Sequence, residues 1–295
     1  MRLIVSSAEG ANGAGYGAVL AFDAAGNALG TFCDDRRVAD PRGVCVDPSG
    51  ELLYVNNGDG RVLAVDRQGV VQKDTGPIDA LDPGGGVFGP DGRYYVGSRR
   101  LRTVMALPAC LDGPAIPYLP QEVVPFPRGF AFAPDGRLFL ASGISPSGIG
   151  ENTIKVFDAD GQLLAPHLVE DSQLSPLDLA LAPNGNLVVS SEWPFGRSDA
   201  ISSVREYDST SGRLVRIFRP DGSILFRNPR GLRFGPDGGL YCVGRDEVVC
   251  FDFETGEFSG AVVTCADLFG QALEFFGSSS AEPATRTSHA GGLSQ

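Results

Sequence analysis

Three arginines occupy the same position of a pattern that recurs along the chain. They are found in Pro41-Arg42-Gly43, Pro127-Arg128-Gly129 and Pro229-Arg230-Gly231. A guanidinium group is planar, stays charged and carries five N–H donors, so it can hold a carboxylate or phosphate by two parallel hydrogen bonds. If the fold brings these arginines together, the chemistry that they predict is anion recognition.

The three tripeptides belong to a longer internal repeat. Two further copies begin at Pro83-Gly84 and at Pro176-Leu177, and each copy continues with apolar runs separated by turns rich in Pro, Asp, Asn and Gly. The register positions are 42, 44, 49 and 53 residues apart, counted along Arg42, Gly84, Arg128, Leu177 and Arg230. This spacing is typical of one four-stranded propeller blade and is too long for leucine-rich or ankyrin repeats.

The copy that begins at Arg42 contains the strands that such a blade needs. Apolar runs lie at 44–46, 52–55, 62–65 and 70–71, and the residues between them include the turn formers Asp, Pro, Ser and Gly. β-Branched and aromatic residues favour pleated strands, whereas Gly, Pro and Asp favour tight turns. The pattern therefore predicts four short strands in each copy.

The two ends of the chain complement each other. Runs at 3–5 and 19–23 match a second and a third strand, and residues 271–277 match the first strand that follows Arg230, 41 residues earlier. One C-terminal strand that joins three N-terminal strands would close the ring and remove exposed sheet edges. We therefore expect an all-β, six-bladed β-propeller over residues 1–276 and a disordered tail at 277–295.

These motifs resemble the NHL repeat and, more loosely, the SMP-30/gluconolactonase-like six-bladed propellers. The resemblance covers residues 1–276, with Pro-x-Gly before an apolar strand and a Pro-Asp-Gly turn after it. The blades also share an aromatic residue or Val followed by Asp, at Phe22-Asp23, Val65-Asp66, Phe157-Asp158, Tyr207-Asp208 and Phe251-Asp252. The resemblance implies the fold, which hosts many unrelated activities.

In propellers of this kind the register positions form a ring at the mouth of the central channel. The ring residues here are Arg42, Gly84, Arg128, Leu177, Arg230 and Gln271. In the gluconolactonase-like group, Glu, Asn and Asp side chains of this ring bind a divalent metal. One acid, Asp178, against three arginines is a poor site for a hard cation, so we predict no resident metal or other cofactor. A rearranged Ca, Mg or Zn site would have to use Asp178, Asn56 and Asp59.

Three arginines around one channel repel one another unless a negative group lies between them. At about 10 Å each pair would cost roughly 1.7 kcal/mol at an effective dielectric constant of about 20. Either a bound anion supplies the counter-charge, or each arginine turns to a neighbouring carboxylate. The first interpretation predicts a small anionic molecule or an acidic peptide end bound by Arg42, Arg128, Arg230, Gln271, Trp193 and Asn57.

Long connections between second and third strands are expected on the same face. They lie at 6–17, 142–152 and 190–202. The last contains Glu192 and the single Trp, Trp193, which either walls a pocket or packs on its own blade. Glu192, Glu9 and Asp178 are the candidate general bases of an enzyme. The only two histidines, His167 and His289, do not predict a Ser-His-Asp triad.

A charged pair is predicted at the seam where the ring closes. Arg233 and Glu274 share a register that holds small apolar residues elsewhere, namely Cys45, Val87, Ala131 and Ala180. Charges at such a position need a partner. We therefore predict a salt bridge between the last blade and the closing strand.

The bulk composition narrows the choice of partners. The 295 residues carry a formal net charge of −12, which argues against a nucleic acid or an anionic membrane as the main partner. No apolar run approaches the roughly 18 residues of a membrane span, and residues 1–7 lack the apolar stretch of a signal peptide. The six Cys form no CxxC pair and are expected as buried free thiols in a cytoplasmic protein, with a Cys242–Cys250 disulfide as the alternative.

Three functions remain open on the sequence alone. The leading hypothesis is a recognition module whose arginine-lined mouth binds an anion. The second is a hydrolase, lactonase or lyase related to the gluconolactonase-like group, and the third is a scaffold for protein–protein interaction. The sequence leaves the oligomeric state open and is compatible with a monomer.

Overall fold

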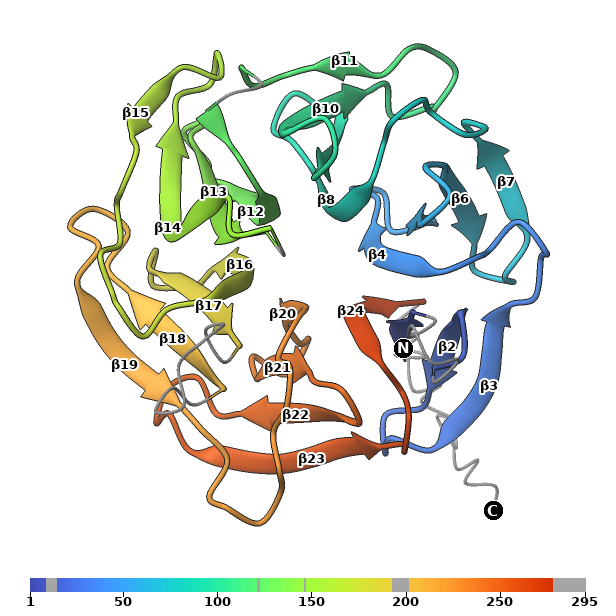
Figure 1. Cartoon of the computed structure of the whole chain (residues 1–295). Coiled ribbons are helices and arrows are strands. Elements are labelled where there is room, and N and C mark those ends of the chain that lie inside the picture. Colours follow the sequence, from blue (N-terminus) through green and yellow to red (C-terminus); the bar gives the residue numbers. More distant parts are fainter. Residues whose placement is uncertain (9–14, 121–122, 146, 193–201, 278–295) are drawn as a thin grey trace, which may run out of the picture.

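Six four-stranded antiparallel sheets surround one axis like the blades of a propeller (Figure 1). The computed structural model describes residues 1–8, 15–120, 123–145, 147–192 and 202–277, and these residues form no α-helix. In each blade the first strand lies nearest the axis and the fourth at the rim. The predicted all-β, six-bladed fold is confirmed. Within the described residues, no helix has the length and apolar character needed to cross a membrane.

The blades are numbered from the one that contains the N-terminus. Blade 1 contains β24 (Gly270–Phe276), β1 (Arg2–Ser7), β2 (Ala18–Phe22) and β3 (Ala28–Cys33), and blade 2 contains β4 (Pro41–Val46), β5 (Leu52–Asn57), β6 (Val62–Asp66) and β7 (Val71–Asp74). Blade 3 contains β8 (Pro83–Phe88), β9 (Tyr94–Ser98), β10 (Thr103–Leu107) and β11 (Ile116–Pro117), and blade 4 contains β12 (Pro127–Phe132), β13 (Leu138–Ile144), β14 (Gly150–Phe157) and β15 (Leu163–Ala165). Blade 5 contains β16 (Pro176–Leu181), β17 (Leu187–Ser191), β18 (Ser203–Tyr207) and β19 (Leu214–Phe218), and blade 6 contains β20 (Leu232–Phe234), β21 (Leu240–Val243), β22 (Glu247–Phe251) and β23 (Phe258–Thr264).

The two ends of the chain meet in blade 1, as predicted. Strand β24 pairs antiparallel with β1, and Leu273 lies opposite Val5 in the register. Strand β24 begins at Gly270, one residue before the expected start. Of the expected tail at 277–295, all but the first residue lies outside the described part of the chain.

Tight turns connect the first and second strands of blades 2–6 at one face of the disc. In blade 2 the Gly50 amide donates to the Asp47 carbonyl at 2.9 Å, and the Asp47 side chain accepts from the Leu52 amide at 2.9 Å. Gly50 has φ 74°, a conformation that residues with a Cβ rarely adopt. Since these turns close one end of each hairpin, the register residues lie at the opposite end of their strands, on the other face of the disc.

The hydrophobic core is divided into layers between neighbouring blades. Each of the six clusters of buried apolar residues combines side chains from two adjacent blades. At the seam between blades 6 and 1, Val243 and Val248 pack with Leu3, Val5 and Leu273, and all five are buried. Every blade therefore depends on two neighbours, and the closing strand completes the last layer.

Three local expectations are corrected by the structure. The expected long connection at 142–152 is mostly strand, because β13 and β14 extend their pairing to Ile144 and Gly150. The fourth strand of blade 2 runs from Val71 to Asp74 rather than over 70–71. All six cysteines are free thiols, but Cys110 is exposed and Cys265 is only partly buried. No Cys242–Cys250 disulfide forms, since Cys242 lies opposite Val249 in the register.

The predicted salt bridge at the seam is present and includes a third member. Arg233 of β20 contacts Glu274 of β24 at 3.1 Å and Asp178 of β16 at 3.3 Å. These three residues, the closure clamp, connect blades 5, 6 and 1. The side chains of Arg233 and Glu274 are 19% and 16% exposed, so the pair is better shielded from water than a surface pair, and loss of one member should be costly.

Glu274→Ala is expected to destabilise the ring by about 3 kcal/mol, which corresponds to a fall in melting temperature of roughly 5–10 °C. The reason is that Arg233 would keep only Asp178 as a counter-charge inside the channel. Glu274→Gln preserves a hydrogen-bond acceptor for Arg233, so its melting temperature should fall less than that of Glu274→Ala. An Ala variant that melts with the wild type in calorimetry would contradict a stabilising role of the closure clamp.

Candidate functional site

The first strands of the blades line a narrow channel along the propeller axis. All six register residues line it, namely Arg42, Gly84, Arg128, Leu177, Arg230 and Gln271. Its volume is about 70 Å³, whereas a water molecule takes up about 30 Å³ in the liquid and pockets for drug-sized ligands measure roughly 300–1,000 Å³. The channel therefore holds a group of a few heavy atoms rather than a large substrate.

On one side of the channel the arginines are paired with acids. Arg42 Nε donates to Asp40 Oδ2 at 2.9 Å, and Arg42 Nη1 contacts Asp82. Asp82 also accepts from Arg99 Nη2 at 2.7 Å. Arg42 therefore turns to neighbouring carboxylates, as the second interpretation of the arginine ring predicts. The two carboxylates already neutralise its charge.

Arg128 is held in a different environment. Its guanidinium lies over the ring of Phe126, with 4.5 Å from Cζ to the ring centre. It also covers Gly143, where an added Cβ would be only 2.9 Å from Nε of the arginine. Nε of Arg128 is buried and has no hydrogen-bond partner. A buried donor without an acceptor is rare in folded proteins.

One carboxylate faces both Arg128 and Arg230. Glu192 Oε1 lies 4.0 Å from Arg128 Nη2, an ion pair without a hydrogen bond. The pKa of Arg128 is lowered to about 10, chiefly by burial; the Glu192 carboxylate opposes this shift, and the charges of Arg230 and Arg99 contribute to it. Burial also lowers the pKa of Arg230, and the negative charge of Glu192 opposes this shift. Within the described residues, the Arg230 guanidinium has no ion pair and no hydrogen bond.

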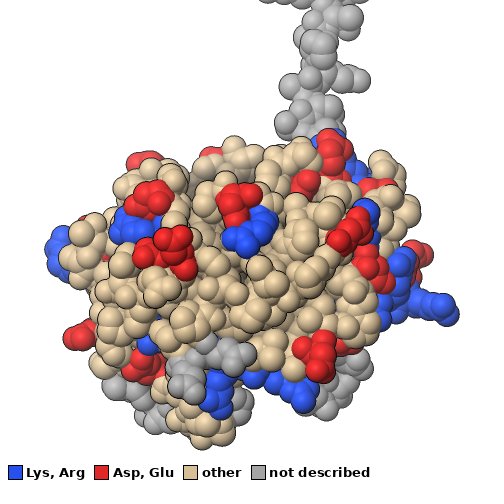
Figure 2. All heavy atoms as spheres, turned by 90° about the horizontal axis from the view of Figure 1, so that it is seen from above, with Lys and Arg blue, Asp and Glu red and all other residues tan. Residues whose placement is uncertain are grey.

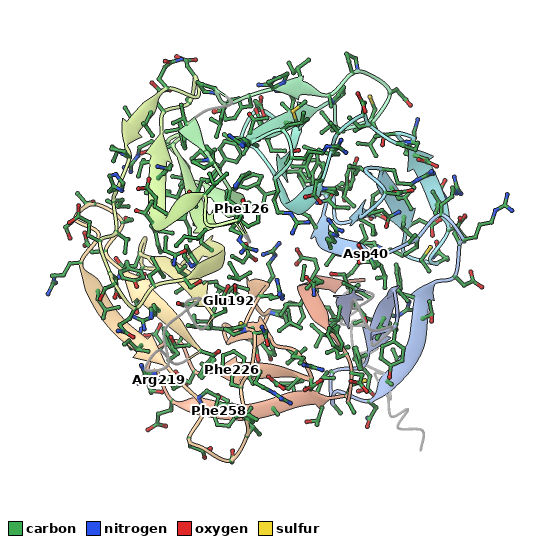
Figure 3. The ribbon with its side chains drawn as sticks, viewed as in Figure 1. Asp40, Phe126, Glu192, Arg219, Phe226 and Phe258 are labelled. Atoms are coloured by element: carbon green, nitrogen blue, oxygen red, sulfur yellow. The ribbon has the colours of Figure 1, made fainter. Side chains whose placement is uncertain are left out.

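The two sides of the channel are visible in the view along the axis. In Figure 3, Phe126 and Glu192 lie on one edge of the central opening and Asp40 lies on the other. Nitrogen-tipped side chains project into the opening between these labels. The positive charge is therefore matched by acids beside Arg42 and undermatched beside Arg128.

Asp178, a candidate general base and metal ligand, is not a free acid at the mouth of the channel. Its carboxylate belongs to the closure clamp and also accepts from the Leu232 amide at 3.1 Å and the Leu179 amide at 3.0 Å. Burial raises the pKa of Asp178, and the Arg233 guanidinium opposes this. Its oxygens are already used to hold three blades together.

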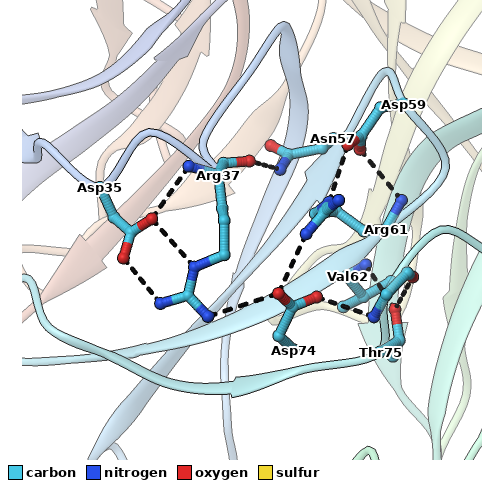
Figure 4. A network of polar contacts seen from close by, with 9 residues as sticks. Asp35, Arg37, Asn57, Asp59, Arg61, Val62, Asp74 and Thr75 are labelled. Atoms are coloured by element: carbon cyan, nitrogen blue, oxygen red, sulfur yellow. Dashed lines mark hydrogen bonds and ion pairs between the residues drawn. The ribbon is translucent and has the colours of Figure 1, made fainter.

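The other residues of the suggested metal site form hydrogen bonds and ion pairs within the protein, at separate places. Asn56 donates to the Gly84 carbonyl at 3.0 Å and accepts from the Tyr94 hydroxyl at 3.0 Å. In Figure 4, Asn57 and Asp59 belong to a polar network between blade 2 and the segment before it, where Asn57 donates to the Arg37 carbonyl at 2.6 Å and Asp59 pairs with Arg61 at 2.7 Å. Asn56, Asn57 and Asp59 do not line the channel.

Of the remaining candidates, one lies in the described part of the chain and two lie outside it. Gln271 lines the channel and donates from Nε2 to the Phe269 carbonyl at 3.0 Å. Glu9 and Trp193 lie outside the described residues. Among the described residues, no three of His, Cys, Asp and Glu gather closely enough to hold a metal ion.

Sequence reasoning missed three residues that shape the site. Asp40 and Asp82 directly precede Pro41 and Pro83, so each occupies the position before a register motif, a regularity that alignment of the copies could have revealed. Arg99 comes from the turn after β9 and reaches the channel from its side. Their partners lie in neighbouring strands or blades, which periodicity alone does not specify.

Outside the channel the charges are mixed. On the side of the disc shown in Figure 2, acidic and basic groups lie next to one another at several places. Ion pairs within single turns include Asp91 with Arg93 and Asp135 with Arg137. This surface therefore offers no single-sign field that would mark a second binding face.

Comparison with known proteins identifies the architecture. No family model matches the sequence, and no curated protein matches it. The likeness is one of fold. A chain of the nidogen/laminin complex superposes with a TM-score of 0.71 at 12% identity, over 92% of this chain and 97% of that chain.

Two enzymes are also among the structural neighbours. A gluconolactonase from Xanthomonas campestris has a TM-score of 0.59 at 18% identity, over 77% of this chain and 76% of its own. Virginiamycin B lyase from Staphylococcus aureus has a TM-score of 0.53 at 15% identity, over 74% of this chain and 68% of its own. The predicted resemblance to NHL-like and gluconolactonase-like propellers is thus confirmed at the level of the fold.

Asp82→Asn is expected to destabilise the protein by about 1–3 kcal/mol, because Arg42 and Arg99 both lose a charged acceptor. The loss should be greater at low ionic strength, where repulsion between the arginines is less screened. Melting curves at low and moderate salt measure this difference. Asp135→Asn, which removes an exposed partner of Arg137, is the matched control, and equal salt sensitivity in the two variants would contradict the prediction.

Proposed function

We propose that the protein is a recognition module that binds small anions in the arginine-lined channel. The observation that carries this proposal is the unmet hydrogen-bonding capacity of Arg128 and Arg230. Arg128 Nε is buried without a partner, and Glu192 is the one described carboxylate within 4.0 Å of the Arg128 guanidinium. Buried guanidinium groups are normally matched by acceptors, so an anionic ligand would complete the site.

The environment favours an anion with oxygen atoms in a plane. The Arg128 guanidinium lies over the Phe126 ring, which restrains the side chain. A guanidinium restrained in this way presents parallel donors that suit a carboxylate or one edge of a phosphate. Because the channel is small, only the anionic end of a ligand would enter, either from a small molecule or from an acidic peptide end.

The alternatives remain distinct and testable. A hydrolase, lactonase or lyase acting in the same channel is suggested by two structural neighbours, one a lyase and one a gluconolactonase. A shared fold alone does not transfer an activity. A scaffold for a partner protein would use the face of the disc and leave the arginines as structural charges. Each alternative predicts a different response to anions and metals.

Carboxylates or phosphate are expected to raise the melting temperature of the wild type and to have no effect on Arg128→Ala or Arg230→Ala. An anion at about 100 times its dissociation constant should add about 2.7 kcal/mol to the folded state. Differential scanning fluorimetry against acetate, phosphate and divalent metals, with and without EDTA, measures the response. Arg137→Ala, which removes an arginine from an exposed turn, should respond like the wild type.

The other outcomes separate the alternatives. Stabilisation by a divalent metal that EDTA reverses would refute the anion site and favour a metal-dependent enzyme. An anion response that persists in both arginine variants would place binding elsewhere on the molecule. No response to anions or metals would contradict the proposed function and favour the protein scaffold.

A further inference from the structure

Glu192 is the acid that any ligand of Arg128 and Arg230 would meet. Its backbone amide donates to the Ser175 carbonyl at 3.1 Å, which fixes the residue at the end of β17. Its carboxylate is 21% exposed and lies 4.0 Å from Arg128 Nη2, too far for a hydrogen bond. Glu192 thus has oxygens that can still accept from a ligand.

An anion without a hydrogen-bond donor would bind here, but less tightly than one that carries a donor. A carboxylate that reaches both arginines would lie beside the Glu192 carboxylate, and like charges in a partly buried site repel strongly. The repulsion is relieved when the ligand places a hydrogen-bond donor between the two carboxylates. The ligand should therefore carry a donor on the atom next to its anionic group.

The charge balance at the mouth indicates which donor. Four arginines, Arg42, Arg99, Arg128 and Arg230, line this layer, and three carboxylates, Asp40, Asp82 and Glu192, pair with them. Among the described residues, one positive charge is left over. A monoanion with a neutral hydroxyl donor would cancel this charge, whereas a zwitterion with an ammonium donor would not.

The floor of the channel keeps an anion at the arginine layer. In the closure clamp two carboxylates face one guanidinium, and backbone amides of Leu232 and Phe275 also donate to these carboxylates, each at 3.1 Å. This layer carries an excess of negative charge. It would repel an anion that moved inward past Arg128 and Arg230.

Ser142 supplies another unfilled polar group beside Arg128. It lies opposite Pro127 in the register of blade 4, next to Gly143, and its Oγ is buried without a hydrogen-bond partner. The serines of equivalent register in blades 3 and 5 are engaged, because Ser98 accepts from the Leu101 amide at 3.2 Å and Ser191 from the Ser175 amide at 2.9 Å. Two unpartnered groups, Arg128 Nε and Ser142 Oγ, thus occur on neighbouring segments.

We propose that the channel selects small 2-hydroxy carboxylates, whose carboxylate binds Arg128 and Arg230 while the hydroxyl donates to Glu192. This inference rests on the proposed anion site and adds the ligand class and a specificity-determining residue. The channel volume of about 70 Å³ fits a carboxylate with its adjacent carbon and hydroxyl. A longer substituent would extend from the mouth.

Isothermal titration with glycolate and acetate tests the proposal, because the two differ by one hydroxyl. The wild type should bind glycolate about tenfold more tightly, as expected for a hydrogen bond to a charged group. In Glu192→Gln the acetate affinity should rise and the preference should fall to about twofold or less. Glu51→Gln, at an exposed acid on the opposite turn of blade 2, should keep the wild-type ratio, and melting curves show that each variant folds.

Each contrary result has a separate meaning. Equal binding of acetate and glycolate, lost in Arg128→Ala, would overturn the hydroxy-acid selection and leave the anion site standing. Tighter binding of glycine than of glycolate would overturn it in favour of a zwitterion. An unchanged ratio of glycolate to acetate affinity in Glu192→Gln would show that Glu192 does not determine the specificity. Absence of binding by either anion to the wild type would overturn both this inference and the proposed function.

Discussion

The pairing of β24 with β1 is the constraint on which the rest of the molecule depends. A propeller blade buries apolar residues on both faces only if it has a neighbour on each side. Here six such layers exist, and the one between blades 6 and 1 requires that the last strand of the chain join the first. Closure also sets the diameter of the ring, because six first strands must then share one axis.

Closure creates an electrostatic problem as well as a core. It brings arginines from different blades into a channel of about 70 Å³, where solvent can screen little of their charge. The structure solves this problem locally at Arg42 and Arg99, which share Asp82. Deeper in the channel, the closure clamp matches Arg233 with two acids from neighbouring blades. In the part of the chain that the structure describes, the side of Arg128 and Arg230 has one carboxylate for two guanidinium groups, an imbalance that the pairs at Arg42 and Arg233 do not have.

Features that depend on the repeat could be predicted from the sequence. The blade count, the shared strand that closes the ring and the Arg233–Glu274 salt bridge all follow from aligning copies, since equivalent positions in a propeller have equivalent places. Contacts that leave the register could not be predicted. Asp178 was expected near the mouth as a free acid, yet it bonds Arg233 on the first strand of the adjoining blade. Asn57 and Asp59 were expected at the site, yet both belong to a network with Arg37 and Arg61.

The arrangement also explains why a shared fold says little about activity here. Side chains of the register positions point to the axis, whereas the apolar side chains that stabilise the ring lie in the layers between blades. A register residue can therefore be exchanged without altering an inter-blade core. In blade 4 the register holds Arg128, and in the next blade it holds Leu177, while the same Pro starts both strands. Specificity in such a ring depends on a few channel residues and their counter-charges, so a neighbour at 12–18% identity can share every layer of the core and none of the chemistry.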